Sequence, residues 1–250
     1  MALVRREPYD LRLGTRSTGP ACMNQSPKEV AGRRAAEFIT DGMTLGLGTG
    51  STVYFTLLAL SERIRAGRLR VRGVPTSLDT ERKALELGIP LAPLDEVESL
   101  DLCIDGADEI DGDFAMIKGG GGALLREKVV ASIARRVVIV VGPEKVVARL
   151  GTTFALPVEV APFARPVVWR ALAKLGCEPK LRTTREGATF LTDNHNEILD
   201  CRFASGIADV PALERAIDAI PGVVESGLFV GLAHALVIGH PDGRAEVRQR

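Results

Sequence analysis

The chain has 250 residues, with 32 basic and 32 acidic side chains, so its formal net charge is zero. Hydrophobic and charged fractions of 46% and 26% are ordinary for a folded globular protein and argue against a disordered chain. Zero net charge argues against a dedicated nucleic-acid binder, and the few aromatic residues argue against base-stacking or polysaccharide-binding surfaces. At about 150 residues per domain, this length predicts one or two domains.

The N-terminal segment gives no sign of export. No run of about 18 apolar residues occurs, so no membrane span is expected, and no apolar core long enough for a secretory signal is present. Residues 1–24 carry a small arginine excess, and we expect a disordered extension or an early start codon rather than an organellar transit peptide. The cysteines show no CxxC spacing and are expected to be buried free thiols in a cytoplasmic protein: Cys22, Cys103, Cys177 and Cys201.

The chain up to residue 150 alternates strands and helices. Ser26, Pro27 and Glu29 form a capping-box pattern that predicts the start of the first helix. The further predicted helices are residues 51–66, 77–87 and 123–135, and the predicted strands are residues 43–47, 70–74, 100–105, 116–117 and 137–141. Apolar strands alternating with helices predict a parallel α/β sheet covered on both faces.

The pattern changes after Leu150. The predicted strands are residues 156–160, 178–182, 188–191, 198–202 and 223–230, with helices over residues 164–175 and 211–220. That order resembles a split βαβ sandwich and predicts a second, smaller domain over residues 151–230. The apolar residues 235–239 could rejoin the first sheet, which gives a first domain of residues 25–150 and 231–250.

A glycine-rich loop, Gly46 to Thr52, lies between a predicted strand and a predicted helix. Its glycines allow the backbone to approach an anion, and a helix N-terminus supplies free N–H groups. Thr49, Ser51 and Thr52 add hydroxyl donors. The loop matches neither a Walker A motif nor the dinucleotide fingerprint, so phosphate binding and a merely tight turn both remain open.

An acidic segment, Asp105-Gly106-Ala107-Asp108-Glu109, follows the carboxyl end of an apolar strand, where ligands bind in open α/β sheets. Its carboxylates could transfer protons or accept hydrogen bonds from a polyol. A solvated acidic turn is the alternative, and a metal site is a third, although Mg²⁺ sites need several oxygen ligands and no His lies nearby.

Lys118 and four following glycines precede a predicted helix that carries Glu127 in its early turns. Four consecutive glycines are entropically costly, so a plain linker inside a compact domain is not expected. Alanines flank Glu127 on the helix and leave space beside its carboxylate, although a surface role is the alternative. Lys145 also follows a strand end, with a surface lysine as its alternative. The three histidines support no catalytic triad.

Together, the segments GLGTGST, DGADEID and KGGGGALLREK, followed by LPVEV and IPGVVESGLF, resemble the ribose-5-phosphate isomerase A family over roughly Ser26 to Gly239. The resemblance implies a Rossmann-like, mostly parallel sheet domain with a smaller ferredoxin-like α+β domain. It also implies interconversion of ribose 5-phosphate and ribulose 5-phosphate in the non-oxidative pentose phosphate pathway. No cofactor or metal, a cytoplasmic location, and a homodimer or homotetramer are expected, with no nucleic-acid or membrane partner.

The resemblance also assigns the site. Glu127 is the implied catalytic base, Lys118 stabilises developing negative charge, and Asp105 and Asp108 handle hydroxyl protons. The implied substrate-binding residues are Thr49, Gly50, Ser51, Thr52, Asp105, Gly106, Ala107, Asp108, Lys118, Gly119, Gly120, Gly121 and Lys145. The alternatives are a non-catalytic sugar-phosphate sensor domain, or an amino-sugar phosphate deaminase or coenzyme A transferase on the same scaffold.

Overall fold

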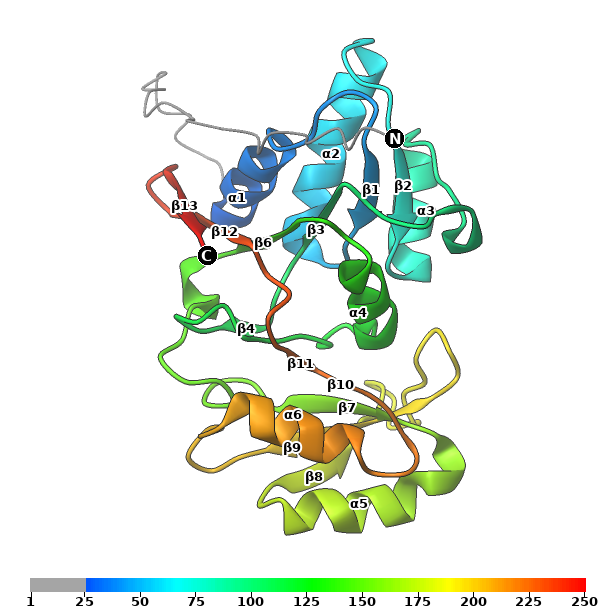
Figure 1. Cartoon of the computed structure of the whole chain (residues 1–250), viewed down its shortest axis with the longest axis vertical. Coiled ribbons are helices and arrows are strands. Elements are labelled where there is room, and N and C mark those ends of the chain that lie inside the picture. The colour runs from blue at the N-terminus through cyan, green and yellow to red at the C-terminus, as the bar shows by residue number, and fades with distance from the viewer. Residues whose placement is uncertain (1–25) are drawn as a thin grey trace, which may run out of the picture.

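The computed structural model describes residues 26–250 and has two parts stacked along the long axis (Figure 1). A six-stranded sheet lies in the upper part and a four-stranded sheet in the lower part. A third, three-stranded sheet is formed by short strands. The extension expected over residues 1–24 lies outside the described residues. None of the described helices is long and apolar enough to cross a membrane.

The six-stranded sheet is parallel except at one edge. Its strands, in order across the sheet, are β13 (Ala245–Gln249), β12 (Ala235–Gly239), β6 (Val137–Val141), β3 (Leu102–Asp105), β1 (Thr44–Leu47) and β2 (Arg72–Pro75). Only β13 pairs antiparallel, with β12. The mostly parallel sheet expected from the alternating strands and helices is confirmed.

Helices cover both faces of this sheet. Successive side chains of β6 point to opposite faces, so alternate residues of this strand pack against different helices. Val138 and Val140 belong to one core cluster together with residues of α1 and α2, whereas Val137, Ile139 and Val141 belong to a second cluster with residues of α4. The helices of this part are α1 (Pro27–Ala36), α2 (Ser51–Arg65), α3 (Leu78–Glu86) and α4 (Leu124–Ser132). A strand buried on both faces has no polar side, which explains its continuous β-branched run.

The first helix starts as its capping box predicts. The Ser26 hydroxyl accepts a hydrogen bond from the Glu29 backbone N–H at 3.2 Å, and Pro27 occupies the first turn. This cap fixes the beginning of α1, and therefore the position of the side chains in its first turn, against the rest of the domain.

The second sheet is antiparallel and has its own core. Its strands, in order, are β10 (Val223–Ser226), β7 (Leu156–Val160), β9 (Glu197–Arg202) and β8 (Glu178–Leu181), and its helices are α5 (Arg165–Lys174) and α6 (Val210–Asp218). Residues of these strands and of both helices share a third apolar cluster. We propose on this basis the division into domains that the sequence predicts: residues 25–150 with 231–250, and residues 151–230.

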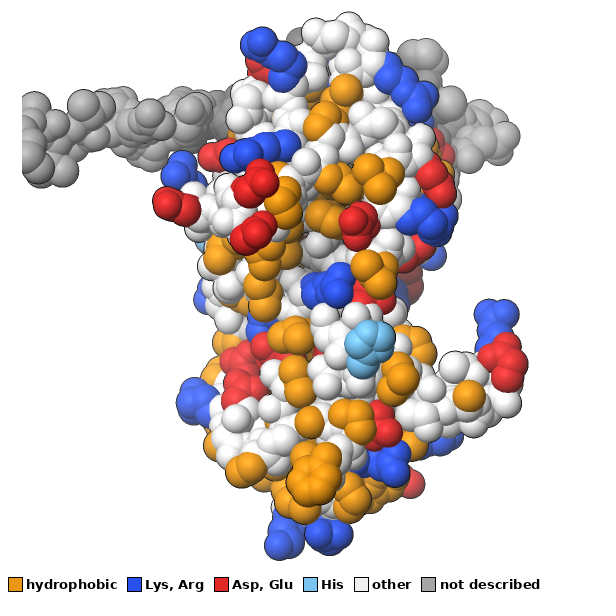
Figure 2. All heavy atoms as spheres, turned by 90° about the vertical axis from the view of Figure 1, so that its right-hand side faces the viewer, with side chains coloured by type: hydrophobic (Ala, Val, Ile, Leu, Met, Phe, Trp, Pro, Cys, Tyr) orange, Lys and Arg blue, Asp and Glu red, His pale blue; other side chains and the backbone are white. Residues whose placement is uncertain are grey.

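A three-stranded sheet provides a second connection within the molecule. It contains β4 (Glu109–Ile110), β5 (Met116–Ile117) and β11 (Leu228–Phe229), so it joins the segment after β3 to the chain that leaves the second domain. The face in Figure 2 narrows between the two parts and shows basic and acidic side chains interspersed.

Two strand predictions are wrong. Residues 223–230 do not form one strand, because the chain passes at Gly227 from β10 in one sheet to β11 in another. A Cβ at Gly227 would lie 2.4 Å from the Lys118 carbonyl oxygen, so the crossing requires glycine. Residues 188–191 make only isolated bridges, because this hairpin turns its Phe190 ring towards Gly122 instead of extending the sheet. The edge strand β13 was not predicted.

Cys103, Cys177 and Cys201 are buried and free, as expected for three of the four cysteines, while Cys22 lies outside the described residues.

Candidate active site

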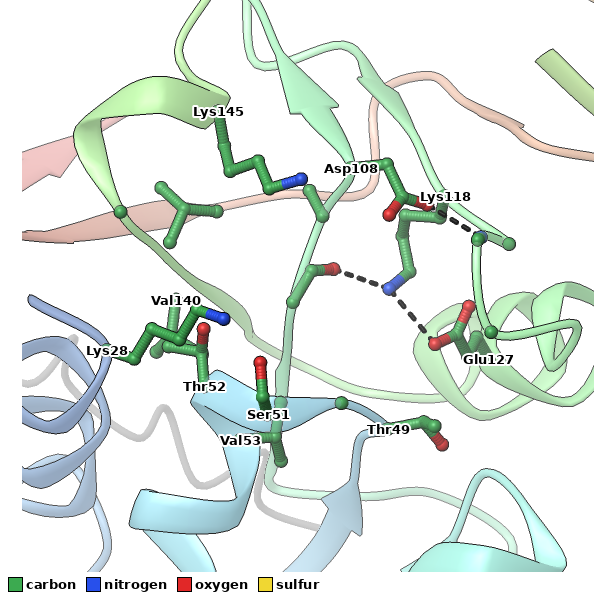
Figure 3. A pocket seen from close by; sticks show the side chains of 18 of the residues that line it. Lys28, Thr49, Ser51, Thr52, Val53, Asp108, Lys118, Glu127, Val140 and Lys145 are labelled. Atoms are coloured by element: carbon green, nitrogen blue, oxygen red, sulfur yellow. Dashed lines mark hydrogen bonds and ion pairs between the residues drawn. The ribbon is translucent and has the colours of Figure 1, made fainter. Parts of the chain in front are cut away.

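A cavity of about 220 Å³ opens at the carboxyl ends of β1, β3 and β6. These three strands are neighbours in the sheet, so the loops that follow them converge on one place, as in other open α/β sheets. The segment after β5 and the start of α4 close a further wall of the cavity (Figure 3). All three glycine-containing segments singled out in the sequence therefore meet at one site.

The loop after β1 presents a helix N-terminus to the cavity. Gly50 precedes α2 at φ +122°, a conformation that favours glycine, and the first N–H groups of a helix have no partner within it. The Ser51 and Thr52 side chains extend from the same turn into the cavity (Figure 3). This turn has the donors and the partial positive charge that bind an anion.

The Thr49 hydroxyl was expected to be a donor of the loop, but in the structure it contacts three other hydroxyl groups. Its Oγ1 lies 2.8 Å from the hydroxyls of both Thr76 and Ser77 and 3.1 Å from that of Thr80. Its backbone N–H donates to Asp105 Oδ1 at 3.0 Å. Thr49 therefore joins the loop to α3 and to β3, while Ser51 and Thr52 face the cavity.

Three charged side chains form a buried cluster at the inner end of the cavity. Asp105, Lys118 and Glu127 are only 1%, 3% and 5% exposed. Lys118 Nζ lies 3.1 Å from Asp105 Oδ2. It also lies 3.4 Å from Glu127 Oε1 and donates to the Gly106 carbonyl (Figure 3). Glu127 Oε2 makes no hydrogen bond to any residue that the structure describes. One oxygen of this carboxylate therefore lies beside the lysine, and the other is buried without a hydrogen-bond partner among the described residues.

Burial sets the ionisation of this cluster. Desolvation raises the pKa of Glu127 to about 8, with Lys118 opposing the rise and the Asp105 charge adding to it. For Lys118, burial alone lowers the pKa, but the carboxylates of Asp105 and Glu127 outweigh it and hold the lysine pKa above its usual value. Near neutral pH, Lys118 is a fixed cation and Glu127 can both take and release a proton.

Asp105 lies behind Lys118 rather than at the cavity surface. Its Oδ1 accepts hydrogen bonds from the backbone N–H groups of Gly106, at 2.7 Å, and Thr49. A Cβ at Gly48 would approach that oxygen to 2.2 Å, so glycine is required there. The sequence predicts that Asp105 touches substrate; in the structure its side chain is buried and paired with Lys118.

Asp108 faces the cavity beside the glycine loop. Its Oδ2 accepts a hydrogen bond from the Gly120 N–H at 2.7 Å, and a Cβ at Gly120 would lie 2.6 Å from Oδ1. Gly106, Ala107, Gly119 and Gly121 line the cavity around it. The carboxylate thus adjoins both the backbone donors of the loop and the space a ligand would fill.

Two lysines line the cavity beside the α2 turn. Lys145 comes from the short helix η2 (Pro143–Lys145) and was expected here, whereas Lys28 in the first turn of α1 was not. In Figure 3 the Lys28 side chain ends beside Thr52 and Ser51, whereas the Lys145 side chain lies above them and extends towards the side of Asp108. Lys28 carried no usable signal, because a lysine after a helix cap is ordinary surface composition, and only the packing of α1 brings it here.

Among residues 26–250 no group of three or more His, Cys, Asp or Glu side chains has an arrangement that would hold a metal ion. The mostly parallel sheet, the buried carboxylate–lysine cluster and the two lysines beside the α2 turn are features of an α/β protein with a polar cavity at the carboxyl end of its sheet, of a kind that suits a small anionic ligand.

Comparison with known proteins identifies the family. The model of ribose 5-phosphate isomerase A (phosphoriboisomerase A) matches residues 72–243. A ribose-5-phosphate isomerase A of Roseiflexus castenholzii is 54% identical over 218 residues, covering 87% of this chain and 93% of the relative. One from Bacillus mycoides is 46% identical, with coverages of 88% and 98%. The chain belongs to the ribose 5-phosphate isomerase A family.

Solved structures agree. Ribose 5-phosphate isomerase from Plasmodium falciparum is 38% identical with a TM-score of 0.86, covering 89% of this chain and 97% of that one. A D-ribose-5-phosphate isomerase in complex with phospho-erythronic acid is 35% identical, also with a TM-score of 0.86 and the same coverages. The fold and the enzyme class expected from the sequence are confirmed, and the sensor, deaminase and transferase alternatives are not favoured.

Proposed function

We propose that this chain interconverts D-ribose 5-phosphate and D-ribulose 5-phosphate through an enediolate, without a cofactor. The observation that carries the mechanism is the position of Glu127, whose carboxylate is buried at the cavity wall, 3.4 Å from the Lys118 ammonium. Moving a carbonyl between C1 and C2 needs one base that removes a proton next to the carbonyl and returns it to the neighbouring carbon.

Glu127 provides that base. Its ionised carboxylate takes the proton from C2 of the open-chain aldose, the electrons of the C–H bond form the C1–C2 double bond, and the aldehyde oxygen becomes an enediolate oxygen. The carboxyl then returns the proton to C1, while the O2 hydroxyl proton moves to O1 and the C2 carbonyl forms. Because Glu127 Oε2 has no hydrogen-bond partner among the described residues, it is free to carry this proton.

The negative charge that develops on the substrate oxygen needs preorganised donors. Lys118 is a cation held in place by Asp105 and by the Gly106 carbonyl, so it does not reorganise during the reaction. The glycines after it line the same cavity, and we assign to the N–H of Gly121, which lines it, the role of a further donor. Lys118 and this backbone donor stabilise the enediolate oxygens.

Asp108 moves the hydroxyl protons. It lines the cavity, unlike Asp105. We assign to its carboxylate the proton transfers at the hydroxyls on C1 and C2 and at the ring oxygen of the furanose form. Asp108 assists ring opening in this proposal, while Asp105 serves by orienting Lys118.

The phosphate binds at the α2 turn. Ser51, Thr52 and the first N–H groups of α2 supply neutral donors, and Lys145 and Lys28 supply charge. A cavity of about 220 Å³ lies below the range of roughly 300–1,000 Å³ typical of drug-sized ligands, which favours a molecule as small as a pentose phosphate.

A coupled assay tests the proposal: ribulose 5-phosphate is measured as it forms from ribose 5-phosphate, with glucosamine 6-phosphate and an acyl-CoA as controls. Turnover of the pentose phosphate alone is expected. Because one relative binds phospho-erythronic acid, this compound should inhibit the chain competitively. Absence of turnover, or turnover of a control substrate instead, would contradict the proposal.

The place of action and the assembly complete the proposal. The enzyme works in the cytoplasm, in the non-oxidative pentose phosphate pathway, as a homodimer or homotetramer. The bacterial relatives of a metabolic enzyme support the compartment. Light scattering coupled to gel filtration measures the mass of the protein in solution. A mass equal to that of one chain would exclude the homodimer and the homotetramer.

A further inference from the structure

The glycine loop of the site is held from outside the cavity by a side chain of the second sheet. Arg182 directly follows β8, and its Nη1 donates to the carbonyl of Gly119 at 2.8 Å and to that of Gly120 at 3.2 Å. Both carbonyls belong to the loop that lines the cavity between Lys118 and α4. Nothing in the sequence pattern singled out this arginine.

Arg182 is itself fixed on the other side. Its Nε donates to Asp200 Oδ2 at 2.9 Å, and its Nη2 pairs with Oδ1 of the same carboxylate, which lies on β9. The guanidinium carbon also lies 5.7 Å from the centre of the Phe190 ring. One planar, five-donor group thus bridges a carboxylate and two carbonyls, a geometry that a lysine ammonium does not reproduce.

The two contacts determine which way the loop peptides face. In the Gly119–Gly120 peptide the C=O points to Arg182 and the N–H donates to Asp108 at 2.7 Å. The C=O and N–H of a trans peptide point in opposite directions. With the Gly120 carbonyl towards Arg182, the N–H of Gly121 therefore points away from the second sheet, on the side of the cavity that Gly121 lines.

Four glycines in a row have the most conformational freedom of any four residues, so their N–H groups face one direction only if something restrains them. Electrostatic stabilisation depends on donors that are oriented before the charge develops. Asp108 restrains one peptide from the cavity side. A turn hydrogen bond from the Gly122 N–H to the Gly119 carbonyl, at 3.0 Å, adds a restraint within the loop. Arg182 restrains the same carbonyl and that of Gly120 from outside the loop.

We propose that Arg182, held by Asp200, is a positioning residue. It fixes the Gly119–Gly120 peptide, whose N–H donates to Asp108, and it orients the N–H of Gly121 towards the substrate. The second domain is then part of the catalytic apparatus rather than only a scaffold. This inference rests on the proposed isomerase mechanism. Because Arg182 acts on the enediolate end and not on the phosphate end, its loss lowers kcat and leaves KM nearly unchanged.

The test uses Arg182→Gln and Asp200→Asn in the full chain, with Arg165→Gln as the matched control. Arg165 also pairs with a carboxylate on β9, Glu197 at 3.0 Å, but it is not bonded to the glycine loop. Direct removal of one oxyanion donor costs about 10²–10³ in kcat, so we expect about a 10-fold fall for either indirect variant and a KM within about twofold. The control should keep its kcat.

Amide hydrogen exchange over residues 119–122 supplies a readout independent of turnover. Exchange should be faster in Arg182→Gln and Asp200→Asn than in the parent chain, and unchanged in Arg165→Gln. If Arg182→Gln fails to fold, Arg182→Lys, which keeps the charge but not the fork, should show the same kcat loss and faster exchange. A parent chain that does not isomerise ribose 5-phosphate contradicts the proposed function, while exchange still tests the restraint.

Three results would overturn the inference. The first is an unchanged kcat in a folded Arg182 variant. The second is an unchanged exchange rate over residues 119–122. The third is an equal fall of kcat in the Arg165→Gln control.

Discussion

Lys118 Nζ lies 3.4 Å from Glu127 Oε1, and both side chains are almost completely buried. Each group changes what the other can do. The ammonium limits how far burial raises the pKa of Glu127, and the carboxylate helps to keep the ammonium charged. A base that ionises near neutral pH and a permanent cation beside it are the two groups that proton transfer next to a carbonyl requires.

The substitution Glu127→Gln should remove the catalytic base and preserve the shape of the side chain. The amide is isosteric, so folding and binding of phospho-erythronic acid should persist, while kcat falls by about 10²-fold or more, the scale of a lost acid–base group. Steady-state kinetics and calorimetry check both parts. Near-normal turnover would exclude Glu127 from its role.

The rate should rise with pH through the ionisation of Glu127. Burial raises the pKa of this carboxyl to about 8, and only the ionised form accepts a proton, so kcat/KM of the free enzyme should reach half its maximum near pH 8 and level off above it. The substrate phosphate loses its second proton near pH 6, so the rise above about pH 6.5 belongs to the enzyme. A flat profile between these values would contradict the assignment.

Neutralising the lysines near the α2 turn should weaken binding more than chemistry. Lys145→Met and Lys28→Met each remove a cation that lines the cavity. Hydrogen bonds to charged groups contribute about 1.5–3 kcal/mol, so KM should rise roughly 10-fold or more with a smaller change in kcat. The exposed Lys174 gives the control Lys174→Met, which should leave KM unchanged. A fall in kcat alone would place these lysines elsewhere in the mechanism.

Glu109→Gln should destabilise the fold. The Glu109 carboxylate is completely buried and accepts hydrogen bonds from the backbone N–H groups of Gly151, Thr153 and Phe154 and from the Thr153 hydroxyl, at 2.5–2.7 Å. The NH₂ group of the glutamine side chain would face these N–H and hydroxyl donors and could accept no hydrogen bond from them. This loss should lower the free energy of unfolding by about 1–3 kcal/mol. Urea titration measures it, with the exposed Glu98→Gln as control. Equal stabilities of the two variants would refute this reading.

Chelation should leave the rate unchanged. Lys118 Nζ lies between the carboxylates of Asp105 and Glu127, in the position where a cation would otherwise balance their charge. Turnover in EDTA should match that in buffer. An activity lost in EDTA and restored by Mg²⁺ would show that the carboxylates hold a metal instead.

The sequence predicts best where local pattern and burial agree. Residues 137–141, 156–160 and 235–239 form strands with the predicted bounds. The first and third are continuous apolar runs of strands buried on both faces, whereas the second alternates apolar residues at 156, 158 and 160 with Pro157 and Glu159. Residues 223–230 look like one strand, yet they change sheets at Gly227, since a period of two along the chain does not specify which sheet a strand joins.

The site shows the same limit. Glu127 and Lys118 lie within short motifs, so their chemistry can be inferred before the fold is known. Lys28 and Arg182 reach the site or its loop only through packing of segments far away in the chain. Asp105 could be assigned to the site, but that it lies behind Lys118 follows only from the three-dimensional arrangement.

The strand order has a consequence for synthesis of the chain. β6 and β12 are neighbours in the sheet, yet the whole second domain is made between them. A nascent chain therefore carries β6 with one edge unpaired until residues 235–239 leave the ribosome, and an unpaired apolar edge is a template for wrong association. All residues of the second domain are synthesised before the six-stranded sheet of the first domain can be completed. Premature termination near the C-terminus would thus yield a chain with every catalytic residue and an open sheet.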